Sequence, residues 1–163
     1  MKKQGFTLIE LMVVIVIMGI LAAVAVPKLF GMIAKSKASE VGPAAGTYVK
    51  LQDAYVSEAN KLGTWELVGY VAPGASTASQ NSPSTTNFTY YVSISEATDI
   101  SSGTDVTNAW VAKNKPALND CGAGNGNWTI EIKGNSNGNS VSYEADVTAA
   151  CEQLTPSFKK IGK

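Results

Sequence analysis

The spacing of hydrophobic and polar residues divides the chain into three stretches. Residues 6–30 are almost wholly apolar and would be hydrophobic on every side of a helix. Residues 31–62 mix alanine with polar residues, and their apolar side chains recur at steps of three and four. Beyond Gly63, short aromatic and β-branched runs alternate with Ser, Thr, Asn and Gly. The order predicts one globular domain preceded by one extra helical element.

The first stretch is long enough to cross a membrane. From Phe6 to Pro27 it would extend roughly 33 Å as a helix, against a bilayer core of about 30 Å. Glu10 interrupts it, and a carboxylate at the centre of a membrane helix costs on the order of 3 kcal/mol. A secretory signal cleaved at Ala23–Ala25 would leave a product starting near Val26, and a plain anchor would keep the helix. Neither interpretation explains Glu10.

The second stretch carries an amphipathic pattern that we expect to pack against a sheet. Its stripe runs through Val41, Ala45, Tyr48, Leu51, Tyr55, Ala59 and Leu62. Gly42, Pro43 and Gly46 weaken the middle of this helix, so we expect a bend there. Gly63 is a plausible C-cap.

The third stretch predicts an antiparallel sheet of about four strands. The strand-like runs are FTYYVSI (88–94), AWVAK (109–113), NWTIEIKG (127–134) and SVSYEADV (140–147). Asn137-Gly138 is a strong hairpin signal between the last two runs. Residues 73–87 form a polar loop of low complexity.

Composition narrows the classes of function. The formal net charge is 0, and no basic face for nucleic acid is evident. Histidine is absent, which removes the commonest general base and metal ligand and excludes histidine-dependent triads. We therefore expect no catalytic residue, no metal site and no cofactor, and we interpret the chain as a non-enzyme. If the chain leaves the cytoplasm, its two cysteines, Cys121 and Cys151, are expected to pair.

The N-terminus resembles that of bacterial type IV pilins and the related pseudopilins. The resemblance rests on a short basic leader ending at Gly5, then Phe6 and Glu10, then an apolar run broken by Gly19 and ended by Pro27. It implies that a prepilin peptidase cuts between Gly5 and Phe6 and that the new amine on Phe6 is methylated. The mature chain would then have 163 minus 5, or 158, residues.

The resemblance also implies how the helix is used. The chain would sit in the inner membrane as a single-pass protein among lipids, meet an assembly platform, and join copies of itself in an extracellular filament. Glu10 would align each incoming subunit by pairing with the terminal amine of Phe6, which lies four residues earlier on the same helical face. The segment from Gly19 to Pro27 would unwind in the filament, although a simple proline kink is the alternative.

The implied architecture is an α+β type IV pilin fold, a long helical spine packed on a small antiparallel sheet. Its expected parts are a leader (1–5), a transmembrane and assembly helix (6–30), an amphipathic second half (31–62) and a globular head (63–163). Cys121 and Cys151 resemble the C-terminal disulfide-bounded loop of many pilins. Because major pseudopilins generally lack that loop, the cysteines favour a pilus subunit.

Three functions therefore stay open at the level of sequence. The first is the major structural subunit of a type IV pilus-like filament, with roles in adhesion or motility. The second is a pseudopilin or minor pilin of a type II secretion or DNA-uptake system. The third is a membrane-anchored polysaccharide-binding module using Trp110 or Trp128, although aromatic residues at strand positions more often belong to the core. Asn87 and Asn127 also start glycosylation motifs, a weak signal in a bacterial chain.

Overall fold

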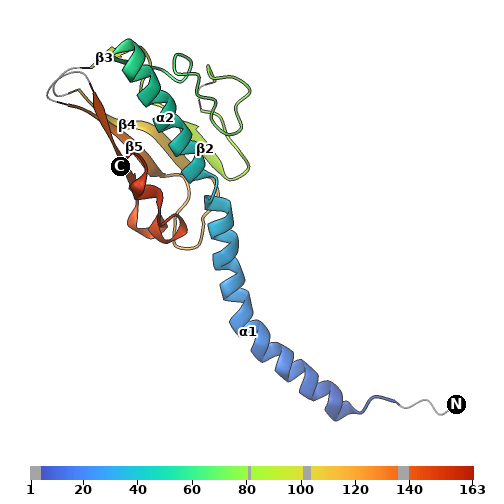
Figure 1. Cartoon of the computed structure of the whole chain (residues 1–163). Helices are drawn as coiled ribbons and strands as arrows, with labels where there is room; N and C mark the ends of the chain where they lie inside the picture. The colour runs from blue at the N-terminus through green and yellow to red at the C-terminus, as the bar shows by residue number, and fades with distance from the viewer. Residues whose placement is uncertain (1–4, 81, 101–103, 136–139) are drawn as a thin grey trace.

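A computed structural model of the protein describes residues 5–80, 82–100, 104–135 and 140–163. A long helix projects from a globular body that contains the sheet (Figure 1). Residues 5–30 are all exposed, and the first buried side chain among the described residues is that of Ala34. We call residues 8–33 the spine and, because side-chain burial starts at Ala34, we extend the head from the expected residues 63–163 to residues 34–163.

Two helices follow each other with a short break. Helix α1 spans Leu8–Ala38 and α2 spans Val41–Ala59. The break at residues 39–40 lies just before Gly42, where the expected bend would begin. Pro43 explains why the break comes earlier. A continuous helix would need Pro43 to donate an N–H to the carbonyl of Ser39, which proline lacks, and would press its ring against that carbonyl. In the first turn of α2 the missing N–H costs nothing.

The break is tied to the head by one carboxylate. Glu40 Oε1 accepts hydrogen bonds from the Tyr90 hydroxyl and from Thr85 Oγ1, both at 2.7 Å. Thr85 Oγ1 in turn accepts from the backbone N–H groups of Asn87 and Phe88. The junction between the helices is therefore held to the segment that leads into the sheet.

The second helix ends earlier than the sequence indicates. Its C-cap is Asn60, in the left-handed conformation with φ of 53°, so the prediction that Gly63 caps it is wrong. Gly63 is instead a packing position, because a Cβ there would lie 2.7 Å from Val68 and 2.9 Å from Tyr55. Asparagine tolerates left-handed backbone better than most residues, which allows it to end the helix.

The predicted four-stranded antiparallel sheet is confirmed. It runs in the order β2 (Phe88–Tyr91), β4 (Asp105–Asn114), β5 (Gly126–Gly134) and β6 (Val141–Val147). The Asn137-Gly138 turn lies outside the described residues. The sequence missed a small second sheet made by β1 (Lys61–Leu62) and β3 (Thr98–Asp99). Two short 3₁₀ helices, η1 (Ala149–Leu154) and η2 (Phe158–Lys160), follow β6.

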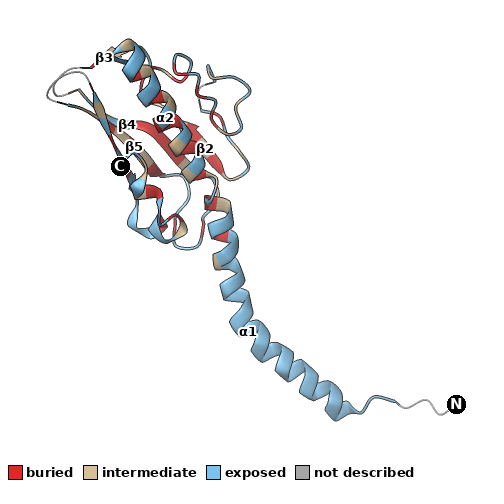
Figure 2. Cartoon of the chain, in the orientation of Figure 1, coloured by how far each residue is buried: buried red, intermediate tan, exposed pale blue. Residues whose placement is uncertain are grey.

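The core lies between α2 and one face of the sheet (Figure 2). The buried positions of α2 are Val41, Ala44, Ala45, Tyr48, Val49, Gln52 and Val56. The expected apolar stripe was therefore right in the first half of the helix. In the second half the buried face is rotated by one residue to Gln52 and Val56, and Leu51, Tyr55 and Ala59 are only half-buried. The rotation brings the fully buried Gln52 amide to the backbone of Gly63, where its nitrogen donates to the carbonyl (3.1 Å) and its oxygen accepts from the N–H (2.9 Å).

Candidate functional site: the N-terminal helix

The first helix starts with a reciprocal cap. Thr7 is the N-cap, and its Oγ1 accepts the backbone N–H of Glu10 at 3.3 Å. The Glu10 carboxylate reaches back to accept the Thr7 backbone N–H (2.9 Å) and the Thr7 hydroxyl (2.6 Å). This is a capping box, in which two otherwise unpaired donors at the helix start are satisfied. In the single chain, Glu10 therefore has hydrogen-bond partners that belong to its own helix.

Sequence reasoning missed Thr7, although a local signal was present. A threonine followed three residues later by a glutamate, just before an apolar run, is the pattern of a capping box. The cap also changes the relation between Glu10 and Phe6. Because α1 begins at Leu8, Phe6 stands outside it, and the two residues do not lie on successive turns of one helix in this structure.

Gly5 and Phe6 precede the cap in exposed, non-helical chain. A Cβ on Gly5 would meet no atom within 4 Å, and Phe6 is 82% exposed. The peptide bond between them is therefore not protected by helix or by packing. Cleavage of this bond and methylation of Phe6 stay predictions.

The spine is apolar and uncovered. Its large side chains from Leu8 to Ile33 are exposed all around the helix, and Figure 2 shows nearly all of this part of α1 in the colour of exposed residues. Within the described residues, one helical stretch is long and apolar enough to cross a membrane, and it contains this segment. A helix that is hydrophobic on every side needs to be buried on every side, and this head does not cover it.

Gly19 and Pro27 both lie within continuous helix. Pro27 sits inside α1, and a Cβ on Gly19 would meet nothing within 4 Å. The helix curves along its length without breaking (Figure 1). The isolated subunit is thus helical at both positions, and unwinding between them, expected only in an assembled filament, stays a prediction.

At the other end of the chain, the expected disulfide is present. Cys121 and Cys151 are bonded and fully buried. Thr148 donates to the sulfur of Cys151 and also to the amide oxygen of Asn127. The buried amides of Asn114 and Asn127 bond to each other and to the carbonyl of Gly122. This network fixes the loop between β4 and β5 to the start of η1.

The aromatic candidates for sugar stacking lie in the core. Trp65, Trp110 and Trp128 are 3%, 0% and 0% exposed. Trp110 Nε1 donates to the Tyr70 hydroxyl, and Trp128 Nε1 donates to Thr155 Oγ1. These rings offer no face to a polysaccharide, so the binding-module hypothesis loses the residues on which it rested. Asn127 is likewise buried, with its amide engaged, and offers no attachment point for a glycan.

Comparison with known proteins agrees with the N-terminal pattern. Residues 1–26 match the family described as the prokaryotic N-terminal methylation motif. The fimbrial protein EcpC of Eikenella corrodens is 31% identical over 157 residues, which cover 96% of this chain and 91% of that protein.

Two further relatives match over shorter stretches. The type IV major pilin protein PilA of Myxococcus xanthus is 41% identical over 69 residues, covering 38% of this chain and 31% of that protein. The type IV major fimbrial protein FimA of Dichelobacter nodosus is 56% identical over 39 residues, a quarter of its length. These two alignments leave most of either relative unmatched.

Proposed function

The chain belongs to the type IV pilin family, and from that premise we propose that it is the major structural subunit of a type IV pilus-like filament. The observation that carries the proposal is the uncovered spine. Its apolar side chains are buried in lipid before assembly and against the spines of other copies afterwards. A homopolymer supplies that cover without any further protein.

Processing precedes assembly in this proposal. A prepilin peptidase in the inner membrane removes residues 1–5, and the new amine on Phe6 becomes methylated. The exposed, non-helical chain at Gly5 and Phe6 gives the peptidase access to the bond. The amine then lies next to Thr7, which already holds the Glu10 carboxylate.

Glu10 acts as the registration group. In the membrane its carboxylate is held by Thr7, which lowers the cost of placing it beside lipid. At the assembly platform, a spine packing against existing spines brings the amine of Phe6 from one copy to Glu10 of another. Breaking such a buried pair by removing one partner costs about 3–5 kcal/mol, so a subunit in the wrong register is rejected.

A pseudopilin or minor pilin of a secretion or DNA-uptake system remains the second candidate. The Cys121–Cys151 loop favours a pilus, as does the description of two relatives as major pilin or major fimbrial proteins. The two roles differ in abundance, since a pilus subunit is made in bulk. Adhesion or motility would be the work of the assembled filament.

The test is electron microscopy of sheared cell-surface material, with intact-mass measurement of its main protein. The proposal expects filaments whose main component is this chain starting at a methylated Phe6. Sheared material that lacks filaments of this chain, from cells producing it in bulk, would refute the structural role. A mature product starting near Val26 would instead support the secretory signal.

A further inference from the structure

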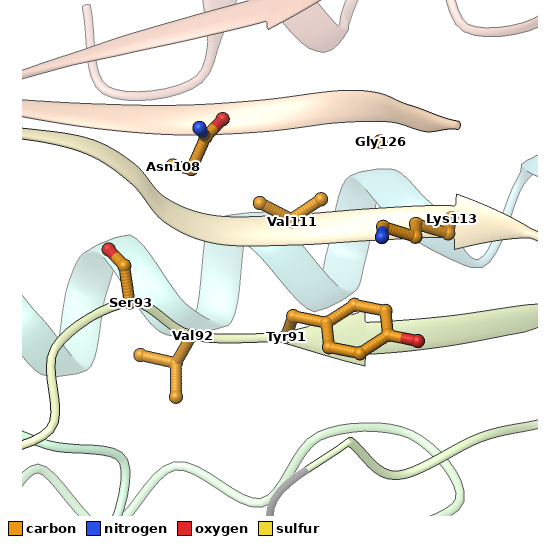
Figure 3. A pocket seen from close by; sticks show the side chains of 7 residues that line it. All are labelled: Tyr91, Val92, Ser93, Asn108, Val111, Lys113 and Gly126. Carbon is orange, nitrogen blue, oxygen red and sulfur yellow. The ribbon is translucent and has the colours of Figure 1, made fainter. Parts of the chain in front are cut away.

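The face of the sheet turned away from α2 carries a cleft that the filament role does not use. Side chains alternate along each strand, so Tyr90, Trp110 and Ala112 enter the core while Tyr91 and Lys113 point to the other side. A cleft of about 460 Å³ opens there, between the end of β2, β4 and the start of β5 (Figure 3). This size is within the range of roughly 300–1,000 Å³ found for small-molecule sites.

Two backbone features shape this cleft. Asn108 lies in β4 with φ of 56°, where the pairing with β5 shifts register between Val106 and Trp110. Such a bulge redirects a side chain, and the exposed Asn108 amide lines the cleft. On β5, Gly126 allows Val111 to pack closely against the backbone at the edge of the cleft, because a Cβ there would lie 2.9 Å from Val111 Cγ1.

The side chains around the cleft are one aromatic ring, one cation, two valines and two neutral polar groups. Lys113 Nζ lies 4.6 Å from the centroid of the half-exposed Tyr91 ring. Among the described residues, no carboxylate forms an ion pair with Lys113. None of the side chains that line the cleft is acidic. The cleft therefore offers an unneutralised positive charge beside an apolar ring face and an amide.

We propose that this cleft binds uronic-acid units of acidic polysaccharides. The apolar C–H face of a pyranose ring packs on Tyr91, the sugar carboxylate accepts hydrogen bonds from Lys113, and the Asn108 amide bonds to ring hydroxyls. A neutral sugar would leave the lysine without a counter-charge. Nucleic acid fits less well, because it is bound by many cations in a stripe and this cleft supplies one.

The inference rests on the proposed filament role in one respect, since the filament repeats the cleft once per subunit. A single shallow site of this kind binds weakly. Many identical sites on one filament raise the overall avidity by about 10²–10⁴ without any new contact. A filament with this cleft would therefore bind firmly to a surface of acidic polysaccharide to which the isolated subunit binds only weakly.

The experiment measures retention of sheared filaments on polygalacturonate beads and on neutral dextran beads. Unmodified filaments should be retained on the acidic beads alone. Lys113→Gln and Tyr91→Leu should each lower retention about tenfold, because each removes one contact of a charged or aromatic group. Asn108→Gly deletes the amide while keeping a residue that accepts positive φ, and should weaken retention less.

Matched controls separate the cleft from general charge. Lys115→Gln makes the same charge change two residues away, outside the cleft, and should leave retention unchanged. Tyr91→Phe keeps the ring and should retain most binding. Equal retention of Lys113→Gln and unmodified filaments on the acidic beads would overturn the proposal. Retention on DNA-coated beads that equals retention on the acidic beads, and that Lys115→Gln also weakens, would overturn it as well, because it would indicate binding by general charge. Filament yield, counted by electron microscopy, distinguishes failure of this inference from failure of the filament role.

Discussion

Both the spine and the four-stranded sheet are built from large apolar side chains, but only the sheet buries them within one chain. Ile130 and Ile132 on β5 are fully buried, whereas Ile15 and Ile17 on α1 are more than half exposed. The sheet closes its own core because α2 covers it, whereas the described residues of the head leave the large apolar side chains of the spine exposed. The same hydrophobic effect therefore stabilises the head by folding and the spine by insertion or assembly.

The carboxylates of the two regions also differ in where their hydrogen-bond partners come from. In the head, the Glu40 carboxylate is held by two hydroxyl groups from distant segments. In the spine, the partner of Glu10 among the described residues is Thr7, three residues away. A local partner holds the carboxylate in the single subunit and leaves it able to change partners when another copy arrives.

The largest expected effect comes from Glu10→Ala, which should abolish or sharply reduce filaments while the head stays folded. In the proposed filament, the alanine removes the carboxylate that pairs with the amine of a neighbouring copy, and it should make membrane insertion easier. Surface filaments and membrane-pool subunits are measured separately in cells lacking the unmodified protein. Normal filament amounts would contradict the registration role, and so would loss of the subunit from the membrane.

A matched variant separates charge from capping. Glu10→Gln keeps an oxygen that accepts the Thr7 N–H, because glutamine also serves at this position of a capping box. If the charge aligns subunits, this variant should fail to assemble nearly as completely as alanine. Assembly at normal levels with glutamine would show that the cap, not the charge, is what Glu10 supplies.

The second prediction compares one kind of residue in the two regions. Ile130→Ala should lower the free energy of unfolding of the head by about 2–5 kcal/mol, because it opens a cavity in a closed core. Ile17→Ala should leave that free energy unchanged, since Ile17 lies on the exposed spine and is not part of the buried core of the head. Urea unfolding of the detergent-solubilised protein, followed by tryptophan fluorescence, gives both values. Equal losses would show that the spine contributes to the fold of the head.

The third prediction concerns the disulfide. Replacing both Cys121 and Cys151 by serine should lower the stability of the head by roughly 3 to 4 kcal/mol, from the entropy of a loop of about 31 residues. The same urea titration measures it, with membrane insertion of the spine as the control that should not change. Thiol labelling of the unmodified protein without reductant should find both cysteines blocked. Quantitative labelling would contradict the disulfide.

The fourth prediction concerns the stability of the head at alkaline pH, where buried tyrosines should make it fall. Burial raises the pKa of Tyr48, Tyr70, Tyr90 and Tyr143 above their ordinary value of 10.0, and a hydrogen bond to Glu40 raises that of Tyr90 further. Below pH 10 these tyrosines keep their protons in both states. Above it the unfolded chain releases protons that the folded head retains, so stability falls. Unfolding midpoints that stay constant up to pH 11 would contradict this.

Much of the fold followed from local pattern. Four of the strands, the long helix and the exposed apolar spine are visible in the sequence because each repeats a short period of hydrophobic positions. The cap formed by Thr7 and Glu10 was equally local and could have been found from its spacing. The end of α2 was misplaced because Gly63 and Asn60 are both acceptable C-caps by type, and only packing on Val68 and Tyr55 distinguishes them.

The sequence by itself determined a membrane-length helix with a carboxylate at its start, and with it the family of the protein. These features depend on neighbours within a few residues, which the order of the chain specifies directly. Only the tertiary structure decided that Gln52 pairs with Gly63, that Glu40 bonds to Tyr90, and that Asn108 lines the cleft at a bulge in β4. Those contacts depend on helix rotation and strand register, where a shift of one residue moves a side chain to another face.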